Sequence, residues 1–294
     1  MVSIVKIDVI SEVSSLLGES PLWHPIENCL YWVDIVTASL YRFDPGTKHI
    51  EKFCLSSELG CIGWRAKGGL IAALRDRFVT IDTETGFEHV VSYPWKNKKN
   101  VMFNDGKCDR HGRFWAGTKD IQEKNSVAAL YCLDTAGVSS EFLSNRFTVS
   151  NGIAWSLDNS RMYICDSPKR QIYQYDFDLA TGRLGPCRVF AQVAANQGFP
   201  DGLTVDSEGY VWSCHWDGWQ ITRYSPQGVV DHVIAVPVPR PTSCCFGGPH
   251  LTTLYVTSAS VGLSASALLE APYSGQIFSI STGIKGLAEP PYEG

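Results

Sequence analysis

The chain has 294 residues, of which 44% are hydrophobic and 19% are charged, so it can bury a sizeable core and is not a disordered protein. Its 25 Lys and Arg against 30 Asp and Glu give a formal net charge of −5, which argues against the basic surface typical of nucleic-acid and membrane-surface proteins. No stretch is long and apolar enough for a membrane-spanning helix, and residues 1–17 lack the apolar core of a secretory signal. None of the ten cysteines forms a Cys-x-x-Cys pair, so we expect reduced thiols in a cytoplasmic protein.

A pattern of short apolar strands recurs six times along the chain. The first strands of the six units begin near residues 19, 61, 104, 151, 201 and 242. A second strand follows in each unit, as in Leu30–Val33, and a third ends at a turn such as Asp44-Pro45-Gly46. Four short strands in about 45 residues is the period of a β-propeller blade, and no unit shows the 3.6-residue period of a helix.

The sequence therefore predicts an all-β fold, a six-bladed β-propeller with four antiparallel strands per blade. No linker or low-complexity segment interrupts the repeats, so residues 1–294 are expected to form a single domain. The sixth unit ends after Phe278–Ser281 and is followed only by a tail that contains Pro and Gly. The strand-like N-terminal run, Val2 to Ile10, is predicted to supply the missing outer strand and to close the ring.

Four polar residues occupy nearly equivalent positions at the start of the first strands of units one, three, four and five. They are Glu19, Asn104, Asn151 and Asp201. The first strand of each blade lines the central channel of a propeller, so we expect these side chains to converge at one mouth of the axis. Asn-Gly and Asp-Gly are also ordinary turn dipeptides, but a turn does not explain the Glu at the same phase of the repeat.

Converging carboxylates without a cation would repel one another and lose hydration. The equivalent positions of the other two units, Cys61 and Thr242, supply no positive charge. A divalent metal ion resolves this conflict, with Glu19, Asn151 and Asp201 as its ligands. Oxygen donors without His or Cys suit Ca²⁺, Mg²⁺ or Mn²⁺, and Zn²⁺ is possible through carboxylates.

The motifs in this order resemble the senescence-marker-protein, gluconolactonase and luciferin-regenerating family, and most closely its bacterial aldonolactonase branch. The resemblance spans nearly the whole chain and is carried by five segments, GESPLW at 18–23, FNDGKCD at 103–109, GRFWAGT at 112–118, SNGIAWS at 150–156 and FPDGLTVDSEGYVW at 199–212. It implies a six-bladed propeller that hydrolyses sugar lactones with a divalent metal. Glu19, Asn151 and Asp201 correspond to the family's metal ligands, and Asn104 to a residue that contacts substrate.

Two positions depart from the family pattern. Many sugar lactonases carry Arg two residues before the Asn of the third blade, where this chain has Met102. The acidic residue of the following loop corresponds to Gln122, although a shift of one residue would bring Glu123 to that place. Both positions contact the sugar in the family, so Met102 and Gln122 are predicted substrate contacts that leave the identity of the lactone open.

The resemblance implies hydrolysis of an aldonolactone, such as glucono-, xylono- or arabinonolactone, to the sugar acid. The metal would polarise the carbonyl, Asp201 would serve as ligand and as candidate general base, and Asn104 would donate a hydrogen bond to the substrate. Hydrolysis of another ester, such as a phosphotriester, and a non-enzymatic calcium-binding propeller remain alternatives. We expect a small-molecule substrate, no nucleic-acid or membrane partner, and a monomer or weak homo-oligomer.

Overall fold

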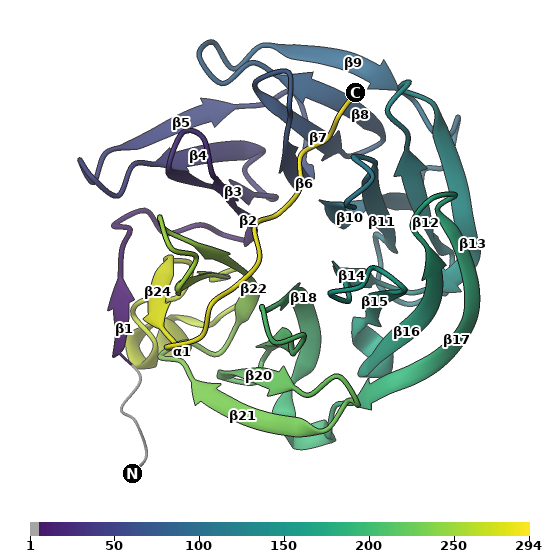
Figure 1. Ribbon diagram of the computed structural model, residues 1–294. Coiled ribbons are helices and arrows are strands. Elements are labelled where there is room, and N and C mark those ends of the chain that lie inside the picture. The colour runs from purple at the N-terminus through teal and green to yellow at the C-terminus, as the bar shows by residue number, and fades with distance from the viewer. Residues whose placement is uncertain (1–5) are drawn as a thin grey trace.

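Each of the six repeats forms one four-stranded antiparallel sheet, and the six sheets surround a central axis as the blades of a propeller (Figure 1). The computed structural model describes residues 6–294. The all-β, six-bladed architecture predicted from the repeat is confirmed. Regular helix is confined to the short α1 (Ala265–Glu270) and the 3₁₀ turns η1 (Ser167–Lys169) and η2 (Ala195–Gln197).

The strands run outward from the axis in sequence order within blades one to five. Blades one to three contain β2 (Gly18–His24), β3 (Cys29–Asp34), β4 (Ser39–Phe43), β5 (Ile50–Cys54); β6 (Leu59–Trp64), β7 (Leu70–Leu74), β8 (Arg77–Ile81), β9 (Glu88–Ser92); and β10 (Val101–Cys108), β11 (Phe114–Asp120), β12 (Ala128–Leu133), β13 (Ser139–Phe147). Blades four to six contain β14 (Ser150–Trp155), β15 (Arg161–Asp166), β16 (Gln171–Asp178), β17 (Arg183–Gln192); β18 (Phe199–Val205), β19 (Val211–Trp216), β20 (Gln220–Tyr224), β21 (Val230–Ala235); and β22 (Pro241–Gly247), β23 (Thr253–Ser258), β24 (Phe278–Ser281) with β1 (Lys6–Val9).

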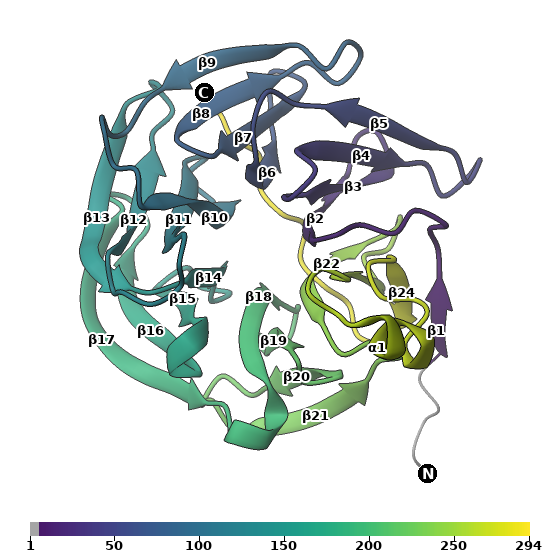
Figure 2. The ribbon, with the colours of Figure 1, turned by 180° about the vertical axis from the view of Figure 1, so that it is seen from behind.

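The N-terminal strand closes the ring, as predicted. Strand β1 pairs antiparallel with β24 from Lys6↔Ser281 to Val9↔Phe278, so the outermost strand of the sixth blade comes from the other end of the chain (Figure 2). Of the predicted run, residues 2–5 lie outside the described residues, and Ile10 follows the strand with a backbone hydrogen bond to Ile277 O.

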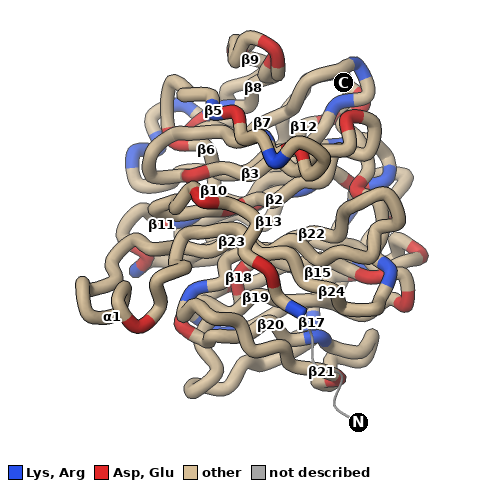
Figure 3. The backbone as a smooth tube through the Cα atoms, turned by 90° about the vertical axis from the view of Figure 1, so that its left-hand side faces the viewer, with Lys and Arg blue, Asp and Glu red and all other residues tan. Residues whose placement is uncertain are grey.

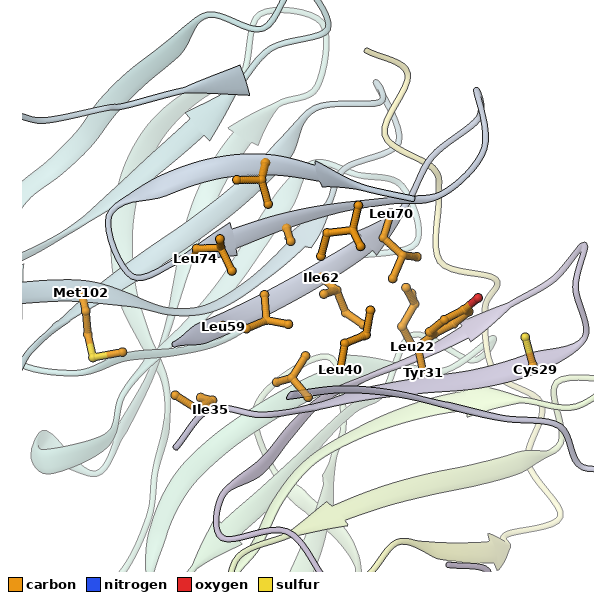
Figure 4. Close-up of a cluster of buried hydrophobic side chains, with 14 residues drawn as sticks. Leu22, Cys29, Tyr31, Ile35, Leu40, Leu59, Ile62, Leu70, Leu74 and Met102 are labelled. Atoms are coloured by element: carbon orange, nitrogen blue, oxygen red, sulfur yellow. The ribbon is translucent and has the colours of Figure 1, made fainter. Parts of the chain in front are cut away.

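Burial decreases from the axis outward, because inner strands pack against neighbouring blades on both faces while outer strands meet solvent. Strands β2, β14 and β22 are buried at every position, whereas β21 is exposed at all but one. Apolar clusters fill the wedges between adjacent blades, and the one shown in Figure 4 joins blades one and two. The polar residues of the first strands are therefore held in rigid, closely packed surroundings.

Aspartates close the hairpin turns that follow the third strand of blades one to four. These are Asp44, Asp82, Asp134 and Asp178, and each accepts a hydrogen bond from a backbone N–H two residues further on. Such Asx turns satisfy the backbone of the loop without help from the core. The recurring Asp and Gly of the sequence pattern are therefore explained by turn geometry.

The C-terminal residues 285–294, here called the C-terminal strap, lie across the axis at one mouth of the ring (Figure 1). The Trp64 indole donates to Glu289 O over 2.8 Å, and the Tyr292 hydroxyl donates to Asp134 O over 2.7 Å. The Glu289 carboxylate pairs with Lys107 at 2.8 Å. These contacts lie beyond the C-terminal ends of the first strands, so the strap covers the mouth opposite to the one predicted for the polar residues.

The surface carries both signs of charge. On the side shown in Figure 3, acidic and basic positions are interspersed among the strands and loops. All ten cysteines are free, as expected for reduced thiols. Within residues 6–294, no helix has the length and apolar character needed to cross a membrane.

Candidate functional site

Every blade has an irregularity at the same point of its first strand. The register between the first and second strands shifts at this point in all six blades, after Glu19 in β2 and at the corresponding positions of the other blades. A β-bulge bends its strand and re-aims the side chain next to it. Asn151-Gly152 and Asp201-Gly202 thus lie in bulges of β14 and β18 rather than in hairpin turns.

Glycine is required at one of these bulges for two reasons. Gly152 has a φ of +47°, a conformation that L side chains rarely adopt. A Cβ there would also collide with Asp201 O and with the Leu203 side chain on the neighbouring blade. The Asn-Gly dipeptide therefore allows blades four and five to approach closely, which brings Asn151 and Asp201 together.

A chain of hydrogen bonds fixes the two asparagines. Asn104 Nδ2 donates to Asn151 Oδ1 at 3.0 Å and to Ser150 O at 3.1 Å. Asn151 Nδ2 donates to Ser167 Oγ at 3.1 Å, and the Ser167 hydroxyl donates to Pro200 O. Both amide hydrogens of Asn104 are thus used within the protein. Its Oδ1 is not used in these hydrogen bonds, so a ligand that contacts Asn104 would meet an acceptor rather than the donor we predicted.

Aspartates at the ends of second strands anchor the segments that enter the site. The Asp34 carboxylate accepts from the backbone N–H groups of Leu16 and Leu17, just before Glu19. In blade four, Asp166 accepts in the same way from Thr148 and Val149, just before Asn151. These positioning residues were not predicted from the sequence, although the Asp that recurs after an apolar second strand was a signal for them.

The four predicted axis residues line one cavity of about 550 Å³ at the mouth opposite to the C-terminal strap. Two further charged side chains, Lys119 and Glu123, form part of its wall. The rest of the wall is mostly apolar and includes Leu17, Ile35, Val36, Val149, Phe199 and Trp216. A concave, largely apolar site with a few convergent polar groups is the usual form of a small-molecule site.

Burial and mutual repulsion disfavour the charged forms of the carboxylates in this cavity. Burial, and then the nearby Asp105, raise the pKa of Glu19 to about 8. Burial, followed by Glu19 and Asp105, also raises the pKa of Asp201 well above its ordinary value, and Lys119 offsets this only in part. Asp105 is better satisfied, since its two oxygens accept from Gly106 N at 2.7 Å and Gly152 N at 2.8 Å.

The donor set fits a hard divalent cation. Asp201 Oδ1 is buried and has no hydrogen-bond partner among the described residues, which is costly unless a cation or another ligand meets it. Glu19 and Asn151 line the same cavity as Asp201. Within residues 6–294 no three His, Cys, Asp or Glu side chains are grouped to hold a metal, so such a site needs the Asn151 amide as third ligand.

Two predicted substrate contacts do not line this cavity. Met102 is buried in the apolar cluster between blades one and two, which also contains Ile35 and Leu59 (Figure 4). Gln122 is exposed on the turn after β11, which is built around Asp120. The next residue, Glu123, has a φ of +55° and lines the cavity instead.

Two consecutive side chains of β19, His215 and Trp216, differ in their placement. His215 is fully buried and its Nδ1 lies 2.8 Å from Gln197 O, so it has a packing role and does not line the cavity. Burial lowers the pKa of His215 to about 4. Trp216 does line the cavity, and the Arg240 guanidinium stacks on its ring.

Comparison with known proteins gives consistent matches over nearly the whole chain. The family described as "SMP-30/Gluconolactonase/LRE-like region" matches residues 17–260. A regucalcin from Xenopus laevis is 32% identical over 300 residues, which cover 99% of this chain and 100% of the relative. A 6-deoxy-6-sulfogluconolactonase from Pseudomonas putida is 36% identical over 281 residues, which cover 95% and 96%. The solved structure of a luciferin-regenerating enzyme aligns with a TM-score of 0.92 at 29% identity and covers 98% of this chain and 99% of that one.

Proposed function

Because the chain belongs to the SMP-30/gluconolactonase/LRE-like family, we propose that it hydrolyses a sugar lactone to the sugar acid with one divalent metal ion. The observation that carries this proposal is the buried Oδ1 of Asp201, which has no hydrogen-bond partner among the described residues and belongs to a residue that lines one cavity with Glu19 and Asn151. A carboxylate kept without a partner in the protein core is costly to folding, and a bound cation with a water molecule explains why it is retained.

The residues of the site would have different roles in the proposed hydrolysis. Glu19, Asn151 and Asp201 would hold the ion, whose Lewis acidity activates a lactone carbonyl. Asp201 would use its second oxygen to take the proton of the attacking water, since both oxygens of a carboxylate can accept. Asn104 would accept a hydrogen bond from a ring hydroxyl through Oδ1, because its own hydrogens are engaged.

The apolar wall would bind the carbon face of the sugar ring. Phe199 and Trp216 both line the cavity, and aromatic side chains cover apolar ring faces while hydroxyl groups point toward polar residues. The Pseudomonas putida relative is named for a gluconolactone that carries a sulfo group, so the lactones considered for this chain include charged ones. A cytoplasmic location and a monomeric or weakly associating state stay predictions.

A direct assay tests the proposal. The protein is stripped of metal with a chelator, and Ca²⁺, Mg²⁺, Mn²⁺ or Zn²⁺ is added back to separate samples. Acid release from a panel of pentono- and hexonolactones is followed with a pH indicator, with spontaneous opening subtracted. We expect at least one ion to restore hydrolysis, and we expect Asp201→Ala to lose both turnover and metal binding.

Matched controls make the result specific. Asp8→Ala removes a half-exposed carboxylate on the outermost strand of blade six, far from the axis, and should behave like the wild type. Full activity after exhaustive chelation would contradict the metal requirement. Metal binding without turnover of any lactone would favour a non-enzymatic propeller, and turnover of a phosphotriester alone would favour the other hydrolase.

A further inference from the structure

Lys119 is the one cationic side chain among the described residues that line the cavity. It lies near the end of β11, opposite Met102 of β10, and its backbone also forms a bridge with Val149 ahead of β14. Its side chain is only 16% exposed. The strand that carries the ammonium is therefore held from both sides, so its position relative to Asn104 and Asn151 is fixed.

The ion pair of Lys119 differs from the structural ion pairs of this protein. Its partner Glu123, at 3.0 Å, belongs to an exposed turn, and the Glu123 side chain is 53% exposed. By contrast, Arg113 pairs with a fully buried carboxylate, that of Asp109. Half-exposed pairs contribute little free energy, so an incoming anion can replace Glu123 as the partner of Lys119 at small cost.

The charges in the cavity leave Lys119 available for a ligand. The carboxylates of Glu19 and Asp201 are balanced by a divalent ion if the proposed function holds, and Asp105 is held by two backbone N–H groups. Apart from these groups, Lys119 and Glu123, the wall of the cavity is mainly apolar. An anionic substituent of a substrate therefore has Lys119 as its cationic partner on this wall.

We propose that Lys119 determines substrate specificity by binding an anionic substituent of the lactone, a sulfonate or phosphate. This assignment rests on the proposed function and deepens it. The family pattern described above places an Arg at the position of Met102, and Met102 is the cross-strand neighbour of Lys119. In this chain the cation lies on the neighbouring strand instead, and Met102 is buried in the apolar core.

Paired substrates that differ only in charge test this role. The kcat/KM is measured for glucono-1,5-lactone, its 6-phosphate and its 6-sulfo analogue. We expect the wild type to prefer the anionic lactones. In Lys119→Met, which keeps the length of the side chain, the ratio of anionic to neutral efficiency should fall by about tenfold, mainly through KM, as for one lost charge-assisted hydrogen bond.

A second variant gives a change of opposite sign. Glu123→Gln removes the competing carboxylate, so the anionic preference should rise by about two- to threefold. If Lys119 acted only by positioning Glu123, the two variants would shift the preference in the same direction. Lys67→Met removes an exposed lysine from the β6–β7 turn, at the other mouth of the ring, and should leave the ratio unchanged.

Binding without turnover separates the two proposals. Calorimetry with 1,5-anhydroglucitol and its 6-phosphate measures ring recognition in the absence of a lactone carbonyl. Tighter binding of the phosphate form by wild type than by Lys119→Met supports the role of Lys119 even if no lactone is opened. Hydrolysis with the same anionic-to-neutral ratio in both proteins would overturn that role and leave the lactonase intact. A preference for only one of the two anions supports the proposal and identifies the substituent.

Discussion

The ion pair between the C-terminal strap and the channel allows a quantitative prediction. Lys107 Nζ donates to Glu289 Oε1 at 2.8 Å and to Leu203 O at 3.1 Å. Burial opposes the charged form of Lys107, but the Glu289 carboxylate, with Asp105, outweighs it and raises the pKa of the lysine. In Glu289→Leu the ammonium stays buried with only a carbonyl for a partner, so the folded state should be destabilised.

The size of the effect follows from the burial of the pair. Removing one partner of a buried ion pair costs about 3–5 kcal/mol, and the residual exposure of 17% for Lys107 and 15% for Glu289 favours the lower value. An unfolding entropy of about 2.1 cal/mol/K per residue amounts to about 0.6 kcal/mol/K for 294 residues. A loss of about 3 kcal/mol therefore lowers Tm by about 5 °C.

Differential scanning calorimetry of a double-mutant cycle measures this effect. The single variants are Glu289→Leu and Lys107→Met, and the double variant joins two apolar side chains of similar size in place of the ions. Because an apolar pair can replace a buried ion pair at little cost, the double variant should recover most of the loss. The reasoning fails if Glu289→Leu shifts Tm by less than about 1 °C, or if the double variant is as unstable as the two losses added together.

Two further predictions concern the bulges that carry the site. A Cβ at Gly202 would lie 2.6 Å from Ser243 Cα, so Gly202→Ala should lower the free energy of unfolding by about 1–3 kcal/mol and weaken Mn²⁺ binding in calorimetric titration. The control Gly46→Ala, in an exposed turn, should change neither quantity. Asp105→Asn should also lower the free energy of unfolding by about 1–3 kcal/mol, because one amide oxygen cannot replace both carboxylate oxygens that accept from backbone N–H groups. An unaltered Tm and Mn²⁺ affinity in this variant would show that Asp105 does not support the site.

The repeat made the architecture and much of the cavity predictable. Four residues that occupy equivalent positions in their blades line one cavity, because the first strands of a propeller surround one axis. These residues are Glu19, Asn104, Asn151 and Asp201. That argument depends only on the period of the pattern. It does not depend on any loop, and loops have no comparable periodicity.

The features that could not be predicted depend on local backbone geometry and on long-range contacts. Whether Gln122 or Glu123 faces the cavity is decided by a turn around Asp120 and by a left-handed backbone conformation. The pairing of Lys107 with Glu289 joins the channel to a tail that the repeat does not include. That Asn104 has only its Oδ1 to offer a ligand follows only when the partners of its amide hydrogens are known.

The closure of the ring by β1 gives the proposed ion a mechanical consequence. The seam lies in blade six, where the two ends of the chain meet in one sheet. Glu19 belongs to blade one and Asp201 to blade five, which are the two neighbours of blade six. An ion held by both residues would therefore link these blades across the seam, in addition to the pairing of β1 with β24. Ring opening and ion release would then be thermodynamically linked. In a chain without its ion, β1 would separate from β24 first, which would expose the edge of β24 to association with other chains.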